Sequence, residues 1–222
     1  MSFFETLQKE TEHERQMLLG QPVIGRALAG DIELETYLGF LHEAYHHVKH
    51  TVPLLMACGS RLPPRLEWLR EAVGEYIEEE TGHQQWILND IEAAGGDPSA
   101  TLDGEPSLAT ELMVAYAYHA IDRKNPIGFF GMVHVLEGTS IALADRAAAS
   151  IKDNLALPKN AFSYLISHGS LDEKHVEFFK RLMNRLEEHS DQQAIVDAAR
   201  RFYLLYAAIF ENLPQPSRRH AA

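Results

Sequence analysis

The sequence predicts a single all-α domain, a helical bundle of about seven helices that spans residues 1–213. Three observations lead to this prediction. Apolar residues recur at the spacing of amphipathic helices, Gly and Pro residues separate these segments, and no segment alternates apolar and polar residues over a useful length. The chain has 222 residues, of which 45% are apolar, and this is enough to bury one sizeable core.

Proline and glycine set the expected helix boundaries, because proline disrupts a helix interior and glycine commonly ends a helix. The predicted helices span, in order, residues 3–19, 33–56, 65–94, 107–123, 125–154, 157–189 and 190–213. Pro53 should kink the second helix. Residues 20–31 and 97–106 are expected to be connectors, and residues 214–222 a disordered tail.

Charge and composition argue against several classes of partner. Thirty-two acidic and 20 basic residues give a formal net charge of −12, which repels phosphate backbones, so no nucleic-acid partner is expected. Residues 1–20 have the pattern of a charged amphipathic helix rather than a signal peptide. No run approaches the ~18 apolar residues of a membrane span, so no membrane partner is expected. The single cysteine, Cys58, cannot form an internal disulfide, which fits a cytoplasmic protein.

Glu80 and His83 form a Glu-x-x-His pair in the third predicted helix. Three residues make about one helical turn, so both side chains are expected on one face, as in helical bundles that present a carboxylate and an imidazole to one metal ion. The pair alone is weak evidence. Glu79 competes with Glu80, and the glutamates at positions 78–80 can equally form a solvated acidic face.

The sixth predicted helix carries His168, Asp172 and His175, which are four and then three residues apart. These positions fall within an arc of about 60°, so three potential ligands stack along one side of the helix. The alternative is a polar stripe in water that contains histidines by coincidence.

Glu137 ends a strongly apolar stretch of the fifth predicted helix. An isolated carboxylate buried there costs several kcal/mol unless a cation neutralises it, so the sequence predicts a metal ion as its partner. His134, one turn earlier, could bind the metal or hydrogen-bond to a ligand, but a core histidine with satisfied hydrogen bonds is the favoured interpretation.

Glu43, His46, His47 and His50 are predicted to share one face of the second helix. Four polar groups on a helix rich in leucine, tyrosine and valine indicate an occupied interior site, although some of them can act by hydrogen-bonding to ligands. Four helices thus offer carboxylates and imidazoles together. Such mixed ligands suit iron or manganese better than structural zinc, and bridging carboxylates can hold two metal ions close enough to bind and reduce dioxygen.

These motifs resemble the haem-oxygenase-like di-iron oxidases, a family also described as iron-containing redox enzymes or TenA-like proteins. The resemblance covers about residues 40–180. It rests on an ordered set of metal ligands: Glu43, Glu80, His83, Glu137, His168, Asp172 and His175. The last three form the more specific motif, and the Glu-x-x-His pair is common.

The resemblance implies a haem-oxygenase-like fold and two irons, the second of which can be loosely held. It implies that the seven residues are the metal ligands and that the carboxylates of Glu43, Glu80, Glu137 and Asp172 are the catalytic groups, with Glu43 completing or bridging the second iron site. The expected activity is an oxidase or oxygenase that activates dioxygen and oxidises a small organic substrate. The identity of the substrate does not transfer with the motif. The oligomeric state, including a homodimer, stays open.

Five residues of the fifth and sixth predicted helices can supply an apolar lining for the substrate: Phe129, Phe130, Met132, Phe162 and Tyr164. Such a lining favours a small apolar or amphiphilic organic acid over a sugar phosphate. The same residues can also be ordinary core.

Other activities share the fold or part of the site. A thiaminase-II-type pyrimidine hydrolase of the TenA-like kind uses a cysteine nucleophile, but Cys58 lies away from the expected position. A haem oxygenase needs an N-terminal axial histidine, and His13 has charged neighbours. A ferritin-like protein would repeat the Glu-x-x-His pair, which this chain does not. A non-catalytic TenA-like binding or regulatory protein would not need the full ligand set.

Overall fold

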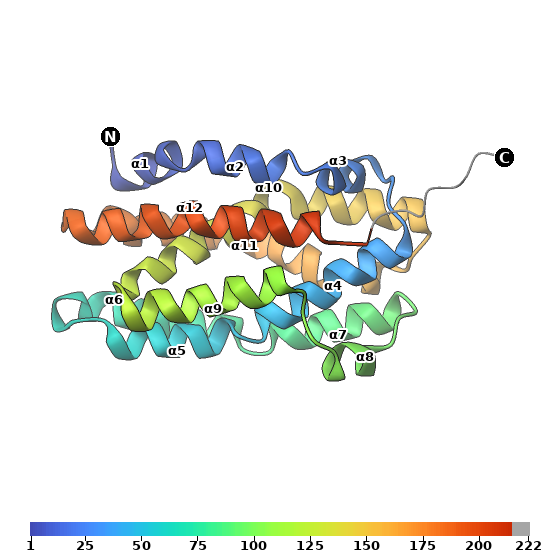
Figure 1. Cartoon of the computed structure of the whole chain (residues 1–222), viewed down its shortest axis with the longest axis horizontal. Coiled ribbons are helices and arrows are strands. Elements are labelled where there is room, and N and C mark those ends of the chain that lie inside the picture. Colours follow the sequence, from blue (N-terminus) through green and yellow to red (C-terminus); the bar gives the residue numbers. More distant parts are fainter. Residues whose placement is uncertain (215–222) are drawn as a thin grey trace.

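The computed structural model describes the backbone of residues 1–214 and the side chains of that range other than those of residues 168–175. In this part of the chain all regular structure is helical and no strand occurs, which confirms the all-α prediction. The helices form an elongated bundle in which α12 runs along much of the long axis beside α1 and α2 (Figure 1).

The α-helices are, in chain order, α1 Phe3–Glu10, α2 Glu12–Leu19, α3 Pro22–Ala29, α4 Leu34–Val48, α5 Thr51–Arg61, α6 Glu67–Glu80, α7 His83–Ala93, α8 Pro98–Asp103, α9 Leu108–Arg123, α10 Phe130–Leu155, α11 Ser163–Asn184 and α12 His189–Glu211. Short 3-10 turns are η1 Pro64–Leu66, η2 Pro126–Phe129 and η3 Lys159–Ala161.

The structure has more helices than predicted, because three expected helices are interrupted and two connectors contain a helix. The first helix is interrupted at Thr11, whose hydroxyl donates to the Leu7 carbonyl at 2.8 Å. The first connector contains α3, which begins at Pro22, and the second contains α8, which is capped by the Asp97 side chain. These two helices have eight and six residues, too few for a helical period to show in the sequence.

The second predicted helix is interrupted at Lys49 and His50, not kinked at Pro53. Pro53 is the third residue of α5, and the first turn of a helix tolerates proline because its N–H groups have no intrahelical partner. The third predicted helix divides into α6 and α7.

Two hydrophobic clusters fill the bundle around α10, which packs against α3, α11 and α12. The larger cluster includes buried residues of α5, α6, α9 and α12, and the smaller one lies where α4 and α7 meet the second half of α10. On α10 the buried residues of the larger cluster end at Val135 and those of the smaller begin at Ala144. Glu137 lies in the interval between them.

The segment Pro126–Leu155, which includes α10, is long and apolar enough to cross a membrane by composition. However, 61% of its most apolar window is buried inside the structure. A helix at the centre of a helical bundle passes the same test, so this is weak evidence for a membrane span.

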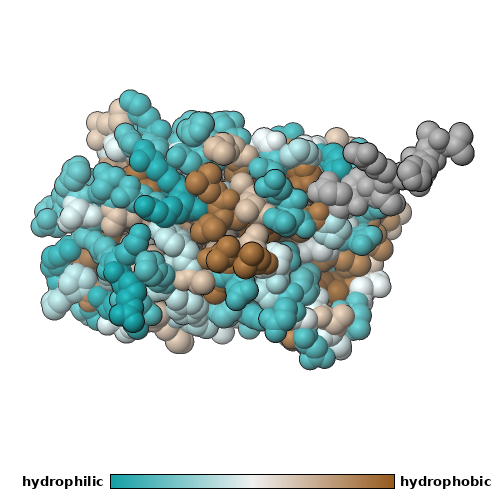
Figure 2. Space-filling view, in the orientation of Figure 1, coloured by the Kyte–Doolittle hydropathy of each residue, from teal (hydrophilic) through white to brown (hydrophobic). Residues whose placement is uncertain are grey.

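The face of the molecule seen in Figure 2 is mostly hydrophilic, with an apolar area near its middle over α9 and α12. These helices carry the exposed side chains of Leu108, Leu112 and Leu204. Scattered exposed leucines are ordinary on protein surfaces.

Candidate metal centre

Glu80 and His83 meet at a break between two helices, not along one helix as predicted. α6 ends at Glu80, Gly82 has a positive φ of 98°, and α7 begins at His83. This break places Oε2 of Glu80 at 3.1 Å from Nδ1 of His83. The His83 ring also stacks on Trp86, with ring centroids 4.0 Å apart. The orientation of the imidazole is therefore fixed by two neighbours.

Replacing Gly82 with alanine is expected to lower the free energy of unfolding by about 1–2 kcal/mol, because an L side chain is strained at this positive φ. Nothing lies within 4 Å of an added Cβ, so the backbone conformation is the cause. Gly74 is the matched control, since it lies inside α6 and also has space for a Cβ. Gly74→Ala should stabilise the protein by about 0.5–1 kcal/mol. Urea denaturation measures both, and a stabilising Gly82→Ala would contradict the assigned strain.

Glu80 and Glu137 line one cavity, which we call the site cavity. It has a volume of about 70 Å³ and lies between α4, α5, α6, α10, α11 and α12. His47 and Tyr76 also line it, and most of the remaining wall is apolar. No lysine or arginine occurs among the described residues of this wall. The described cavity wall thus carries two carboxylates and one imidazole, and carboxylates in apolar surroundings favour a cation as partner.

Tyr76 lies beside the carboxylates of the site cavity. Burial raises the pKa of its hydroxyl well above the usual value, and the nearby Glu137, Glu79 and Glu80 carboxylates raise it further. The phenol therefore stays protonated at neutral pH and can donate a hydrogen bond to Glu137. Such a donor fixes the orientation of a carboxylate that binds a metal. The sequence contained one signal for this role, since Tyr76 lies four residues before Glu80.

His168, Asp172 and His175 lie outside the residues whose side chains are described, so their ligand role stays a prediction. Their helix, α11, packs against α7 and α10. Before the three positions, Tyr164 lines the site cavity. After them, Val176 lines a larger space of about 720 Å³, here called the outer cleft, whose wall also includes Phe4, Arg15 and Phe179. Glu137 borders both spaces.

The side chains described here include no group of three His, Cys, Asp or Glu residues that could hold a metal ion.

Asp90, which the sequence reasoning missed, holds the beginning of α11. This α7 residue is fully buried, and its carboxylate accepts hydrogen bonds from the backbone N–H groups of Ser163 (2.9 Å) and Tyr164 (2.8 Å) and from the Ser163 hydroxyl. An acidic group at a helix N-terminus satisfies N–H groups that lack an intrahelical partner. α7 thus carries His83 at its first residue and anchors α11 two turns later.

Glu43 lies elsewhere than predicted. Its carboxylate accepts hydrogen bonds from the Ser107 N–H at 3.0 Å, from the Ser107 hydroxyl at 2.9 Å and from the Thr110 hydroxyl, so it caps the N-terminus of α9. It is not among the residues that line the site cavity. This geometry does not support its predicted role as a bridging ligand or catalytic group. A helical wheel shows which residues share a face but not which neighbouring helix that face meets.

Replacing Glu43 with glutamine is therefore expected to lower the free energy of unfolding by about 1.5–3 kcal/mol, the contribution of hydrogen bonds to a buried charged group. Iron content should not change. Glu35→Gln, at an exposed position of the same helix, is the control and should stay within about 0.5 kcal/mol. Denaturation and metal analysis check both variants, and loss of iron without loss of stability would restore Glu43 as a ligand.

The histidines of the second predicted helix also separate. His47 lines the site cavity. Nδ1 of His46 lies 3.0 Å from Nζ of Lys49, and Nδ1 of His50 lies 3.2 Å from the Tyr118 hydroxyl. Of these three histidines only His47 is among the described residues that line the site cavity, and the spacing along one helix does not show which histidine faces a cavity between several helices.

His134 is a core histidine, as the sequence favoured, but the prediction that its hydrogen bonds are satisfied is wrong for Nε2 within the described part of the chain. Its ring stacks on Phe179 and meets the edges of Phe4 and Tyr203, and it lines the outer cleft. Its Nε2 atom has no hydrogen-bond partner among the described residues. Burial, together with the positive charge of Arg15, lowers the pKa of His134 to about 4.

The lowered pKa of His134 predicts that the free energy of unfolding decreases in acid. An unfolded histidine binds a proton below about pH 6.5, whereas the folded His134 stays neutral down to about pH 4. This contribution to stability is therefore present above pH 6.5 and decreases as the pH falls from 6.5 to 4. His134→Phe should reduce the loss of stability between pH 6.5 and 4.5 by roughly 2 kcal/mol. Urea denaturation at both pH values checks this, and an equal change in His13→Phe, at an exposed position, would contradict it.

Cys58 and His13, which were considered for a thiaminase-II-type hydrolase and for a haem oxygenase, are poorly placed for these roles. Cys58 is fully buried, its Sγ lies 3.3 Å from the Pro126 carbonyl, and burial raises the pKa of its thiol to about 12. A reactive cysteine needs an accessible thiolate. His13 is exposed and lines neither the site cavity nor the outer cleft.

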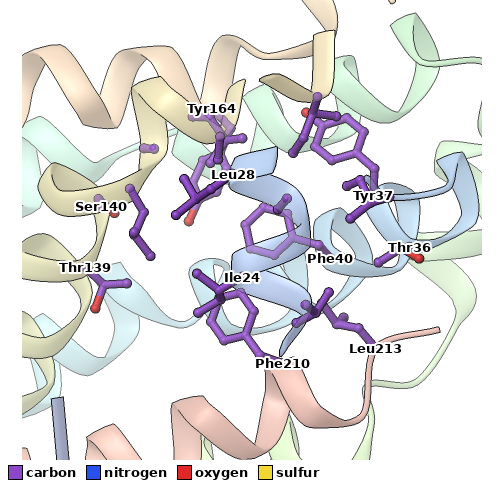
Figure 3. Close-up of a pocket in the computed structure, with 18 of the residues that line it drawn as sticks. Ile24, Leu28, Thr36, Tyr37, Phe40, Thr139, Ser140, Tyr164, Phe210 and Leu213 are labelled. Carbon is purple, nitrogen blue, oxygen red and sulfur yellow. The ribbon is translucent and has the colours of Figure 1, made fainter. Parts of the chain in front are cut away.

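A second cavity, here called the apolar cavity, lies between α3, α4, α10, α11 and α12 (Figure 3). Its volume is about 80 Å³, several times the ~10–15 Å³ that one water molecule needs. No charged side chain occurs among its described lining residues. Ser140, Tyr164 and Tyr206 line both this cavity and the site cavity. An unfilled cavity of this size costs on the order of 2 kcal/mol of stability.

Three of the five residues of the predicted substrate lining border a cavity. Phe129, Met132 and Tyr164 line the site cavity. Phe130 and Phe162 are fully buried in the core and line neither cavity. The apolar cavity itself was not predicted, because its wall comes from five helices and apolar periodicity does not distinguish a cavity wall from solid core.

Comparison with solved structures places this bundle in the haem-oxygenase-like class. A domain of unknown function with a heme oxygenase-like fold from Shewanella denitrificans OS217 is 25% identical, with a TM-score of 0.82, over 95% of this chain and 91% of that one. A TenA homologue from P. horikoshii OT3 is 12% identical, with a TM-score of 0.78, over 95% and 97% of the two chains. Heme oxygenase from Leptospira interrogans is 18% identical, with a TM-score of 0.75, over 96% and 100%.

The chain belongs to the family of iron-containing redox enzymes, whose model matches residues 38–207. The predicted resemblance is thereby confirmed at the level of the family and the fold. No curated protein matches the sequence.

Proposed function

We propose that the chain is a non-haem di-iron oxidase or oxygenase that uses dioxygen to oxidise a small apolar or amphiphilic organic substrate. The observation that carries the proposal is the placement of Glu80, paired with His83, and Glu137 around the site cavity beside α11. Membership of an iron-containing redox family supports iron as the metal.

The residues that would hold iron are Glu80, His83 and Glu137, together with the donors predicted on α11, His168, Asp172 and His175. Bound iron would supply the binding and reduction of dioxygen. Carboxylates and imidazoles together are a suitable donor set for it.

The chain's own residues orient these groups and keep water away. Glu80 and Trp86 fix the ring of His83, and Tyr76 can donate a hydrogen bond to Glu137. The apolar walls of the site cavity, including Leu54, Phe129 and Met132, limit the access of bulk water to the metal ligands.

Trp86 allows a direct test because its ring stacks on His83. In a Trp68→Phe variant, Trp86 is the only tryptophan of the sequence. Anaerobic addition of ferrous iron should quench its fluorescence in a saturable way, with up to two irons bound per chain by metal analysis. Addition of oxygen should then consume dioxygen and oxidise the iron. Absence of saturable iron uptake by the folded protein would overturn the proposal.

The alternative, a thiaminase-II-type hydrolase of the TenA-like kind, has support from the fold alone. The buried, hydrogen-bonded thiol of Cys58 does not favour it. Hydrolysis of an aminopyrimidine by iron-free protein, abolished in a Cys58→Ser variant, would favour the hydrolase over the oxidase.

A further inference from the structure

The apolar cavity adjoins the site cavity through a shared wall. Ser140 of α10, Tyr164 of α11 and Tyr206 of α12 line both spaces. A molecule in the apolar cavity therefore lies next to the space that Glu80 and Glu137 border. In Figure 3, Ser140 and Tyr164 lie on one side of the apolar cavity, and Thr36, Tyr37 and Leu213 lie on the opposite side.

The wall of the apolar cavity extends along α10. The α10 residues that line it lie on one side of the helix and are Thr139, Ser140, Leu143, Ala144, Ala147 and Ile151. The rise of an α-helix over the twelve steps from Thr139 to Ile151 is about 18 Å. A space of this shape beside one helix face suits a linear chain better than a compact ring.

The polar groups of the apolar cavity also indicate which end of a bound molecule would face the site cavity. The Thr36 hydroxyl donates to the Pro214 carbonyl at 2.8 Å, and the Tyr37 hydroxyl donates to the Ala161 carbonyl at 2.6 Å. The Thr139 hydroxyl is likewise engaged, by the Val135 carbonyl. These hydroxyls have their hydrogen bonds within the protein, so apolar atoms can lie against them without leaving a buried donor unsatisfied. The other three polar side chains of the described lining, Ser140, Tyr164 and Tyr206, lie together at the wall shared with the site cavity.

From these observations we propose that the substrate carries a linear aliphatic chain that occupies the apolar cavity, with its polar, reactive end beyond Ser140, Tyr164 and Tyr206 in the site cavity. This inference rests on the proposed function for the reactive end. The binding of the chain itself depends only on the shape and apolar character of the cavity.

The test uses n-alkanols as probes, because a neutral head group is not repelled by Glu80 and Glu137 when iron is absent. The full chain is titrated by calorimetry with n-hexanol and each longer alkanol up to n-tetradecanol, in parallel with and without ferrous iron under anaerobic conditions. The Kd should fall about fourfold per added methylene, the equivalent of ~0.8 kcal/mol each, until the apolar cavity is filled, and then stop falling.

A substitution in the wall should move the chain length at which affinity stops rising. Ala144 is buried in this wall, so Ala144→Leu should shorten that length by about two to three carbons, since leucine adds three carbons. Ala147→Leu, at a partly buried position of the same wall, is the second variant if Ala144→Leu does not fold. Ala149→Leu, on an exposed position of α10, is the control and should leave the chain-length profile unchanged.

The possible results separate this inference from the proposed function. Iron uptake without chain-length-dependent alkanol binding would overturn the chain-binding proposal and leave the oxidase proposal intact. Chain-length-dependent binding that shifts in Ala144→Leu, without iron uptake, would support the apolar cavity as a binding site and overturn the oxidase proposal. Tighter binding of cyclohexylmethanol than of n-heptanol, or an equal shift in Ala149→Leu, would also overturn the linear-chain proposal.

Discussion

Replacing Glu137 with glutamine is expected to abolish iron retention. The substitution keeps the shape of the side chain but removes the negative charge, and Glu137 borders both the site cavity and the outer cleft. Loss of a hydrogen-bonding partner of a metal ligand commonly costs about 10–100-fold in affinity, and loss of a ligand should cost more. Metal analysis after anaerobic loading with ferrous iron measures the effect.

The same variant should be more stable than the parent chain when both lack metal. Removing one of two carboxylates from the site cavity relieves their repulsion, which is on the order of 1 kcal/mol for partly buried charges several ångströms apart. Glu79→Gln is the control, because Glu79 is exposed and does not line the cavity. Normal iron content in Glu137→Gln, or equal loss in Glu79→Gln, would remove Glu137 from the ligand set.

The second substitution with a large expected effect on iron binding is at Asp172 of α11. Asp172→Ala should sharply reduce iron content or oxygen consumption, because Asp172 is predicted to share one arc of the helix with His168 and His175. Stability without metal should stay the same or rise, since clustered carboxylates repel one another in an empty site. A purely structural role would instead lower stability by more than about 1 kcal/mol and leave the metal content unchanged.

Glu173 is the control for this helix because it is one residue off the predicted arc. Glu173→Ala should retain iron and change stability by no more than about 0.5 kcal/mol. If Glu173→Ala loses as much iron as Asp172→Ala, the wrong face of α11 has been assigned to the site. Iron analysis and urea denaturation of the two variants decide between these roles.

The sequence predicted the class of fold and the pairing of Glu80 with His83, but it gave the wrong reason for the pairing. Helical spacing alone places two residues three apart on one face. In the structure, the positive φ of Gly82 ends one helix and the next begins at His83. A glycine inside an apparent helix is a signal for such a break, although it does not reveal the geometry that results.

The prediction for Glu43 and the open roles of His46, His47 and His50 have a different origin. Glu43, His46 and His47 are buried polar groups, and His50 is partly buried. Their partners, however, come from residues far away in the sequence, such as Ser107 for Glu43 and Tyr118 for His50. The periodicity of one helix contains no information on these partners, so tertiary contacts were needed to separate a cap from a ligand. Asp90 was missed for the same reason, because its partners begin at Ser163.

The anchoring of α11 by Asp90 has a consequence for metal exchange at the proposed iron site. α7 begins at His83 and holds the first turn of α11 through hydrogen bonds that involve no metal. We therefore expect the two helices to keep their mutual position with and without iron, so that the proposed site can be emptied and refilled without disassembly of the bundle. The rate of reconstitution should then follow the concentration of ferrous iron and stay independent of refolding, in contrast to small domains whose folding and metal binding are one event.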